Sequence, residues 1–221
     1  MLAVAIVGHA AAALLYAVLL PDTSVRRAVY FGSKLVINAL PVVWVFAIER
    51  RRMRFLRPSA NAIVSGVCTG LVIGGAILLF YHSAIAGRLD ATGLRARVGA
   101  YGMLDHFFLF AAFICVANSG MEEYYWRWFV FAGLKREMDW PWAVVVSAAG
   151  FTLHHIVVLA AYFSGAGLIV LCNLGVFVGG CIWAAQYHRT GSIYATWASH
   201  LIADAAIMVV AYDLLIGPVV P

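Results

Sequence analysis

Three short segments of this sequence contain ionisable residues whose types and spacing are typical of acid–base catalysis. Apolar residues surround each segment. Among these ionisable residues are Glu122 and Glu123 in SGMEEYYWRWFVF, His155 in GFTLHHIVV, and His200 with Asp204 in WASHLIAD. In water-poor surroundings, a carboxylate beside an imidazole can hold and deprotonate a water molecule. Other hydrogen-bond donors can stabilise the oxyanion that forms when this water attacks a carbonyl group. These residue types therefore indicate hydrolysis of a peptide bond.

The spacing within the first two segments indicates which residues share a helix face. Residues four apart lie on one face of a helix, whereas adjacent residues diverge by about 100°. Glu123 and Arg127 are therefore predicted to form an ion pair, which leaves Glu122 on a different face. On that different face Glu122 can point toward His155. Phe151 and His155 share a face of their own helix in the same way as Glu123 and Arg127.

Composition places these segments in a membrane. Of the 221 residues, 64% are hydrophobic and only 11% are charged, whereas a soluble domain is about half apolar and about a quarter charged. A soluble enzyme, a disordered tail and a disulfide-built secreted module are thereby excluded, and an all-α polytopic membrane bundle is predicted. The net charge of +5 does not indicate nucleic acid, because five of the fifteen Lys and Arg residues lie within residues 50–57, beside a hydrophobic span. Such a run is typical of a cytoplasmic anchor on anionic lipid.

Hydropathy divides the chain into spanning helices, each of which needs about 20 mostly apolar residues. An eighth span stays open, because the fourth helix is longer than a simple span and contains Asn118, Ser119 and Gly120, where we expect a kink. The polar and apolar connection before it is expected to lie in the membrane interface. The seven predicted helices are 1–20, 27–48, 61–86, 105–136, 141–163, 166–188 and 192–216.

The depth of the polar residues in these helices favours one shared site. Under this topology the fourth helix ends, and the fifth and seventh begin, on the same side of the membrane. At 1.5 Å per residue, Glu122 lies about 20 Å deep, His155 about 21 Å, His200 about 14 Å and Asp204 about 20 Å. His200 and Asp204 also share a helix face. Intramembrane ionisable residues are costly and mark functional sites by default.

The three segments resemble the motifs of the CAAX protease and bacteriocin-processing family of intramembrane glutamic-type proteases, which is related to the Ras-converting CAAX endopeptidase. These motifs are E-E-x-x-x-R, F-x-x-x-H and H-x-x-x-N/D, each on its own transmembrane helix, and all three occur here in order. The resemblance divides the single membrane domain into N-terminal transmembrane helices with an amphipathic connection, residues 1–104, and a protease core, residues 105–216.

The resemblance implies roles for the motif residues. Glu122 and His155 would activate a water molecule, while His200 and Asp204 would form or support the oxyanion hole. The remaining motif residues would stabilise the site, and they are Glu123, Arg127 and Phe151. Asp204 stands where the CAAX endopeptidases carry Asn, and an ionised Asp has no proton to donate. We therefore expect Asp204 to be protonated or to orient His200.

The resemblance leaves the cofactor open between two alternatives. A metal-free glutamate mechanism is favoured, because the H-E-x-x-H signal of common zinc proteases is absent. Zinc or another divalent metal is the alternative, since carboxylates and imidazoles are zinc-type ligands. The residues that would then hold the metal are Glu122, His155, His200 and Asp204.

The resemblance also indicates the partners and the location. The expected substrate is the C-terminal tail of a membrane-associated protein or peptide, either a prenylated CAAX end or the tail of a C-terminal sorting system, and the second is favoured. The protein is expected to be integral to a membrane, with a bacterial inner membrane favoured. Two other functions use the same residues: a small transporter or proton pathway, and a non-catalytic immunity or scaffold protein.

Overall fold

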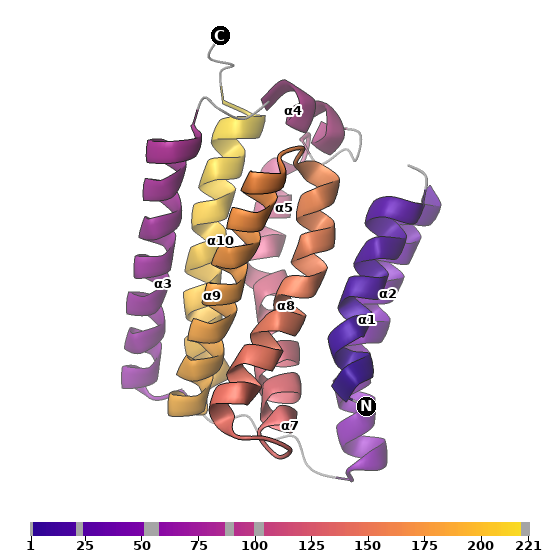
Figure 1. Cartoon of the computed structure of the whole chain (residues 1–221), viewed down its shortest axis with the longest axis vertical. Coiled ribbons are helices and arrows are strands. Elements are labelled where there is room, and N and C mark those ends of the chain that lie inside the picture. The colour runs from indigo at the N-terminus through magenta and orange to yellow at the C-terminus, as the bar shows by residue number, and fades with distance from the viewer. Residues whose placement is uncertain (1, 21–23, 51–57, 87–90, 100–103, 218–221) are drawn as a thin grey trace. The chain divides into compact units, whose positions relative to one another are not determined.

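A computed structural model describes residues 2–20, 24–50, 58–86, 91–99 and 104–217 (Figure 1). All regular secondary structure in these ranges is helical, which confirms the predicted fold class. The helices, with π-helical segments marked η, are α1 (Leu2–Leu14), η1 (Leu15–Leu19), α2 (Ser24–Val43), η2 (Trp44–Ile48), α3 (Ala60–Phe80), η3 (Tyr81–Ile85), α4 (Ala91–Gly99), α5 (Phe107–Ala112), η4 (Phe113–Asn118), α6 (Ser119–Glu123), η5 (Tyr124–Phe131), α7 (Ala132–Leu134), α8 (Trp140–Tyr162), α9 (Ala166–Thr190) and α10 (Ile193–Leu215).

Six helices within the described ranges are long and apolar enough to cross a membrane, and they match six of the seven predicted spans. The remaining predicted span, the fourth helix at residues 105–136, is helical from Phe107 to Leu134 but alternates between α and π geometry. One such change falls between Asn118 and Ser119, where the sequence predicted a kink. π-helical turns inside α-helices are found frequently at functional sites.

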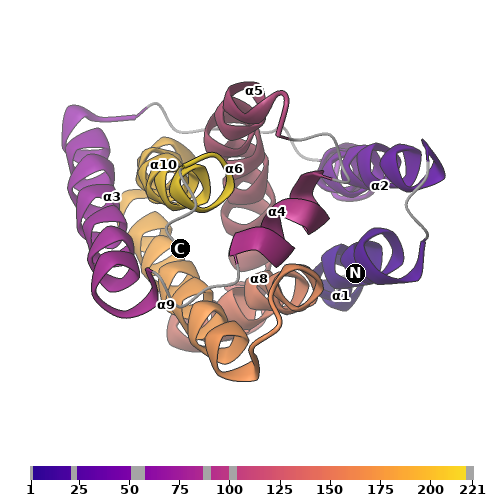
Figure 2. The same ribbon diagram turned by 90° about the horizontal axis from the view of Figure 1, so that it is seen from above.

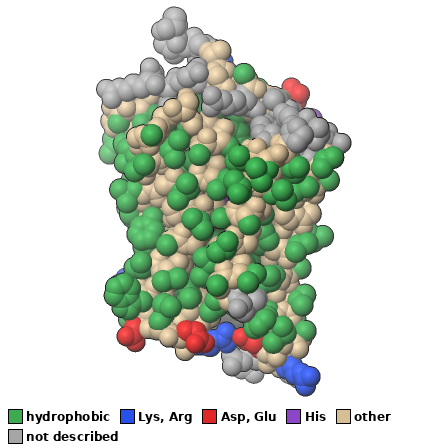
Figure 3. Space-filling view, turned by 45° about the vertical axis from the view of Figure 1, so that its right-hand side comes forward, with side chains coloured by type: hydrophobic (Ala, Val, Ile, Leu, Met, Phe, Trp, Pro, Cys, Tyr) green, Lys and Arg blue, Asp and Glu red, His purple; other side chains and the backbone are tan. Residues whose placement is uncertain are grey.

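The surface of the described residues suits a lipid environment. Many large apolar side chains are exposed on the long helices, for example Leu35 and Val72, each 73% exposed. In the face shown in Figure 3, hydrophobic side chains are spread along the helices, and few charged side chains lie among them. Together with the six apolar helices, this surface is that of an integral membrane protein.

The chain divides into two compact units, and each unit combines segments from before and after residue 104. Unit 1 comprises Met1–Arg57 and Tyr124–Ile193, and unit 2 comprises Pro58–Glu123 and Tyr194–Pro221. The division falls between Glu123 and Tyr124, inside the first motif.

Unit 2 is built on a close approach of α3 to α10, which lie side by side in Figures 1 and 2. Three glycines spaced four residues apart on α3 make this approach: Gly66, Gly70 and Gly74. A Cβ atom on Gly70 would lie 2.9 Å from the Cα atom of Ser199, and a Cβ on Gly66 would meet the carbonyl oxygen of Ala195. Small residues at this spacing let the backbones of membrane helices pack directly.

Unit 1 places α1 against α8 by a similar device. A Cβ atom on Gly150 of α8 would lie 2.8 Å from the indole ring of Trp126 and 2.9 Å from the side chain of Ile6 on α1. The hydroxyl of Tyr125 donates a hydrogen bond of 2.9 Å to the carbonyl of Ala5. The first helix is thus packed on residues of the first two motifs, although it carries no motif itself.

Candidate active site

The polar residues of unit 2 meet around the imidazole of His200 on α10. Its Nδ1 atom lies 2.9 Å from Oε1 of Glu123, and its Nε2 atom lies 3.8 Å from Oε2 of Glu122. Nε2 is also 3.6 Å from Oδ1 of Asp204, one turn further along α10. All four side chains are buried. Residues distant in sequence, on α6 and α10, therefore form one cluster of three carboxylates and one imidazole.

The geometry of His200 determines what each ring nitrogen can do. A carboxylate only accepts hydrogen bonds when ionised, so at 2.9 Å Nδ1 is the donor to Glu123. The contacts of 3.6 and 3.8 Å made by Nε2 exceed a direct hydrogen bond. Nε2 therefore faces the oxygens of Glu122 and Asp204 without a direct hydrogen bond in either of these contacts.

Asn118 joins this cluster, and the motif-based reasoning missed it. Its Nδ2 atom donates a hydrogen bond of 3.0 Å to Oε1 of Glu122, and both side chains are buried. The sequence reasoning treated Asn118 only as part of a kink. The i,i+4 spacing of Asn118 and Glu122 was the signal that could have found this bond, since such pairs face one another on a helix.

A tryptophan on α10 sets the register between the two helices of the cluster. The indole Nε1 of Trp197 donates to the carbonyl of Val116 at 3.0 Å and lies 3.1 Å from Oγ of Ser119. A Cβ on Gly120 would lie 3.2 Å from the same indole nitrogen, so Gly120 lets the ring approach. Trp197 and His200 are about one turn apart on α10, and Ser119 and the two glutamates are about one turn apart on α6. The contact between Trp197 and Ser119 therefore places His200 beside the glutamates.

The motif residues of unit 1 form a different kind of cluster. The guanidinium carbon of Arg127 lies 5.1 Å from the ring centroid of Phe151 and 5.6 Å from that of Trp183. Arg127 is completely buried. Cation–π contacts gain strength when the cation is removed from water. The aromatic ring of the second motif thus helps to hold the arginine of the first.

His155 has a defined ring orientation in unit 1. Its Nδ1 atom lies 2.9 Å from the carbonyl oxygen of Phe151, and because a carbonyl only accepts, Nδ1 carries the proton. In the neutral ring Nε2 is then the acceptor. The ring of the neighbouring His154 is stacked on Trp126 at 6.1 Å between ring centroids and lies 5.3 Å from the ring of His9 on α1.

The predicted site residues therefore fall into two groups. Glu122, Glu123, His200 and Asp204 are brought together in unit 2. Three others belong to unit 1, where they contact one another through the ring of Phe151, and they are Arg127, Phe151 and His155. The roles assigned to these residues from the resemblance stay predictions.

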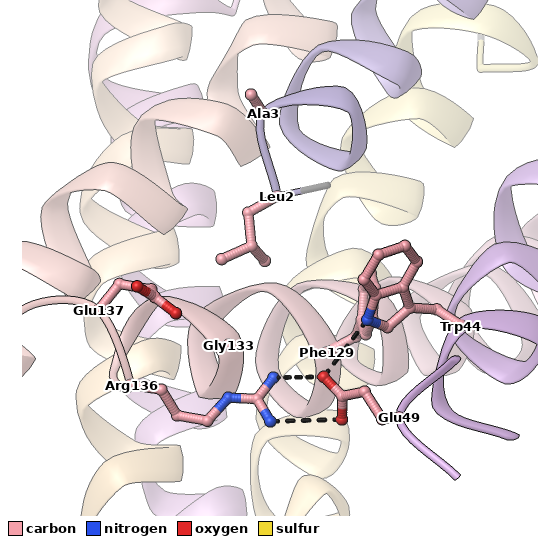
Figure 4. A pocket seen from close by; sticks show the side chains of 8 residues that line it. All are labelled: Leu2, Ala3, Trp44, Glu49, Phe129, Gly133, Arg136 and Glu137. Atoms are coloured by element: carbon pink, nitrogen blue, oxygen red, sulfur yellow. Dashed lines mark hydrogen bonds and ion pairs between the residues drawn. The ribbon is translucent and has the colours of Figure 1, made fainter. Parts of the chain in front are cut away.

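A cavity of about 620 Å³ lies in unit 1, away from the motif residues of that unit (Figure 4). It contains an ion pair of 2.9 Å between Arg136 and Glu49, and the indole of Trp44 donates to the same glutamate at 3.3 Å. The polar groups drawn in Figure 4 are thus largely bonded to one another. The cavity is lined by Leu2, Ala3, Trp44, Glu49, Phe129, Gly133, Arg136 and Glu137.

Comparison with known families gives a match to the part of the chain that carries these buried polar residues. Residues 104–206, slightly less than half of the chain, match the family described as type II CAAX prenyl endopeptidase Rce1-like. The match covers all three motifs and supports the resemblance to the CAAX protease and bacteriocin-processing family. It supports a peptidase of the CAAX endopeptidase type. No curated protein and no solved structure gives a significant match.

Proposed function

We propose that this protein is an intramembrane endopeptidase that cleaves near the C-terminus of a membrane-associated protein, with Glu122 and His155 activating the water. The observation that carries this proposal is the buried cluster in which the His200 imidazole contacts three carboxylates. Charged groups inside a membrane are rarely retained without a function. The family match points to peptide hydrolysis as that function.

The proposed reaction uses Glu122 as the base. Its carboxylate takes a proton from the water while Nε2 of His155 accepts a hydrogen bond from the same water and orients it. The water oxygen forms a bond to the scissile carbonyl carbon, and the carbonyl oxygen becomes an oxyanion. The carbon–nitrogen bond then breaks, and Glu122 returns its proton to the departing amine.

His200 is the proposed stabiliser of the oxyanion. When the ring carries a proton on each nitrogen, Nδ1 donates to Glu123 and Nε2 can donate to the oxyanion. The carboxyl group of Asp204, 3.6 Å from Nε2, orients the ring or donates its own proton when protonated. Its side chain thus takes the place of the Asn that CAAX endopeptidases carry.

The donor types of the same cluster also fit a divalent metal. Glu122, His200 and Asp204 offer zinc-type ligands, and the bond from Nδ1 of His200 to Glu123 is the support that metal-bound histidines usually have. With His155 these residues would hold the ion, which would polarise the scissile carbonyl as a Lewis acid. We favour the metal-free mechanism, and chelation tests the choice.

The proposed substrates are C-terminal tails that lie in or on the membrane. Two kinds fit: a prenylated CAAX end, from which the last residues are removed, and the tail of a C-terminal sorting system. We favour the sorting tail. Both kinds place the scissile bond where a membrane-embedded site can reach it.

The experiment that tests this function compares C-terminal peptides from membrane and secreted fractions of host cells. Cells with the wild-type protein are compared with cells that carry Glu122→Gln at equal expression, and Glu137→Gln serves as the control because Glu137 lines the separate cavity. Proteins that keep intact tails only in Glu122→Gln cells would support a protease and identify its substrates. Equal peptide profiles with folded protein present would contradict the proposal and favour a transporter or scaffold.

A further inference from the structure

Asn118 lies at the point where the backbone changes from π to α geometry. The π-helical segment η4 ends at Asn118, and the backbone N–H of Ser119 bonds to the carbonyl of Ile114, five residues earlier. A change of this kind rotates the residues that follow relative to a regular α-helix. Asn118 and Glu122 nevertheless remain one turn apart, so the amide reaches the carboxylate at 3.0 Å.

The hydrogen bond from Asn118 gives the two oxygens of the Glu122 carboxylate different surroundings. Oε1 accepts from Nδ2 of Asn118 at 3.0 Å, while Oε2 lies 3.8 Å from Nε2 of His200. Both Asn118 and Glu122 are buried, with 8% and 6% of their surfaces exposed. In such surroundings a hydrogen bond to a charged group is stronger and more directional than in water. The contact therefore fixes the rotation of the carboxylate.

From this geometry we infer that Asn118 is a positioning residue for hydrolysis, which holds the Glu122 carboxylate so that Oε2 takes the proton from the water. The inference deepens the proposed function and rests on it. Asn118 does not touch the water or the substrate in this mechanism. It acts through Glu122, because the bond to Oε1 sets the direction in which Oε2 points.

The contact of Trp197 gives the asparagine a defined place. The indole N–H bonds to the carbonyl of Val116, two residues before Asn118, and also contacts Ser119. The backbone before Asn118 and the side chain of Ser119 after it are thereby held to α10, the helix that carries His200. A positioning residue needs this kind of support, because a loosely held amide would not select one rotation of its partner.

The kinetic test replaces Asn118 by Leu, which has a similar volume and no hydrogen-bond donor. The matched control is Asn173→Leu, since Asn173 is equally buried and its Nδ2 bonds to the carbonyl of Ile169 one turn earlier. The assay uses purified protein in lipid nanodiscs and an internally quenched peptide with a tail found in the C-terminal comparison. Asn118→Leu is expected to lower kcat about 10–100-fold at unchanged KM, and Asn173→Leu to leave kcat unchanged.

A double-mutant cycle separates positioning from general destabilisation. In protein that already carries Glu122→Gln, adding Asn118→Leu is expected to have no further effect on the residual rate, because the carboxylate to be positioned is gone. Equal additional losses in both backgrounds would overturn the inference. If Glu122→Gln itself cleaved normally, the proposed function would fail, whereas wild-type kcat in Asn118→Leu alone would overturn only the role of Asn118.

A spectroscopic measurement tests the same bond without any substrate. The infrared carboxyl band that disappears in Glu122→Gln belongs to Glu122. This band is expected to shift in Asn118→Leu, because its hydrogen-bond donor is lost, and to stay in place in Asn173→Leu. An unshifted band in Asn118→Leu would show that the amide does not bond to Glu122 in the membrane protein.

Discussion

The clusters of motif residues in the two units differ in chemistry. In unit 2, polar side chains surround His200. One hydrogen bond connects Glu123 to His200 and another connects Asn118 to Glu122. In unit 1, the buried charge of Arg127 is held by the rings of Phe151 and Trp183. The cluster in unit 2 contains carboxyl and imidazole groups that can exchange protons. The cluster in unit 1 holds the guanidinium group of Arg127, which keeps its proton.

One short motif contributes residues to both clusters. The first motif runs from Glu122 to Arg127, and the boundary between the units passes through it after Glu123. The residues before the boundary place two carboxylates beside His200, whereas those after it pack in the interior, as Tyr125, Trp126 and the arginine do. We therefore expect changes in the polar cluster, and in His155 of unit 1, to affect the rate, and changes in the other residues of the aromatic cluster to affect stability.

The largest expected effect contrasts two adjacent histidines of unit 1. His155→Ala is expected to lower kcat by about 10²–10⁴-fold, because the acceptor that orients the water is lost. His154→Ala is expected to lower the thermal stability and to retain kcat, because His154 is stacked in the aromatic cluster. The measurement is cleavage in nanodiscs together with thermal unfolding followed by circular dichroism. Comparable losses of kcat in both variants would break the distinction between chemistry and packing.

The next largest effect concerns the glycines that join α3 to α10 in unit 2. Gly70→Leu is expected to destabilise the protein by about 3 kcal/mol, because the added side chain meets the backbone of Ser199 and forces the helices apart. Gly75→Leu on the same helix is the control, since a Cβ there has open space. Both are measured by resistance to thermal unfolding in nanodiscs. If the two variants unfolded at the same temperature, the close approach of these helices would be wrong.

A smaller effect is expected from the hydrogen bond that ties α1 to the first motif. Tyr125→Phe removes the hydroxyl that donates to Ala5, and we expect a loss of about 1 kcal/mol of stability. The catalytic rate should not change, because the ring remains in the aromatic cluster. Chemical unfolding and the cleavage assay on the same preparation measure both quantities. A fall in kcat at unaltered stability would show that α1 takes part in the chemistry.

The smallest expected effect is that of removing metal. If the carboxylates around His200 hold water, as proposed, prolonged dialysis against a zinc chelator should leave the rate of cleavage unchanged. Elemental analysis of the active protein should then find less than stoichiometric metal. Loss of activity that zinc restores, with one metal bound per chain, would instead make the polar cluster of unit 2 part of a ligand set.

Sequence reasoning predicted the helices well, and the reason is physical. Within a bilayer every backbone polar group must be bonded inside the segment, so apolar runs of sufficient length become helices. The six long helices agree with the predicted ranges to within a few residues. The π-helical segments of the fourth predicted helix were not predicted, because hydropathy does not distinguish α from π geometry in residues 107–134.

The candidate site was predictable only in part. The i,i+4 relation of His200 to Asp204 follows from helix geometry alone, and the structure has it. The contact of His200 with Glu123 was not foreseen, because it joins residues 77 positions apart. The hydrogen bond from Asn118 was within reach of spacing arguments but lay outside the motifs.

Amino-acid sequence alone is sufficient to predict the membrane class, the ranges of the helices and the identity of the ionisable residues buried in them. These follow from hydropathy and from the periodicity of single helices, which are local properties. Only the tertiary structure decided which side chains meet: Asn118 with Glu122, Glu123 with His200, and Arg127 with two aromatic rings. The physical reason is that the rotation and register of packed helices depend on how small residues such as Gly70 let distant backbones approach.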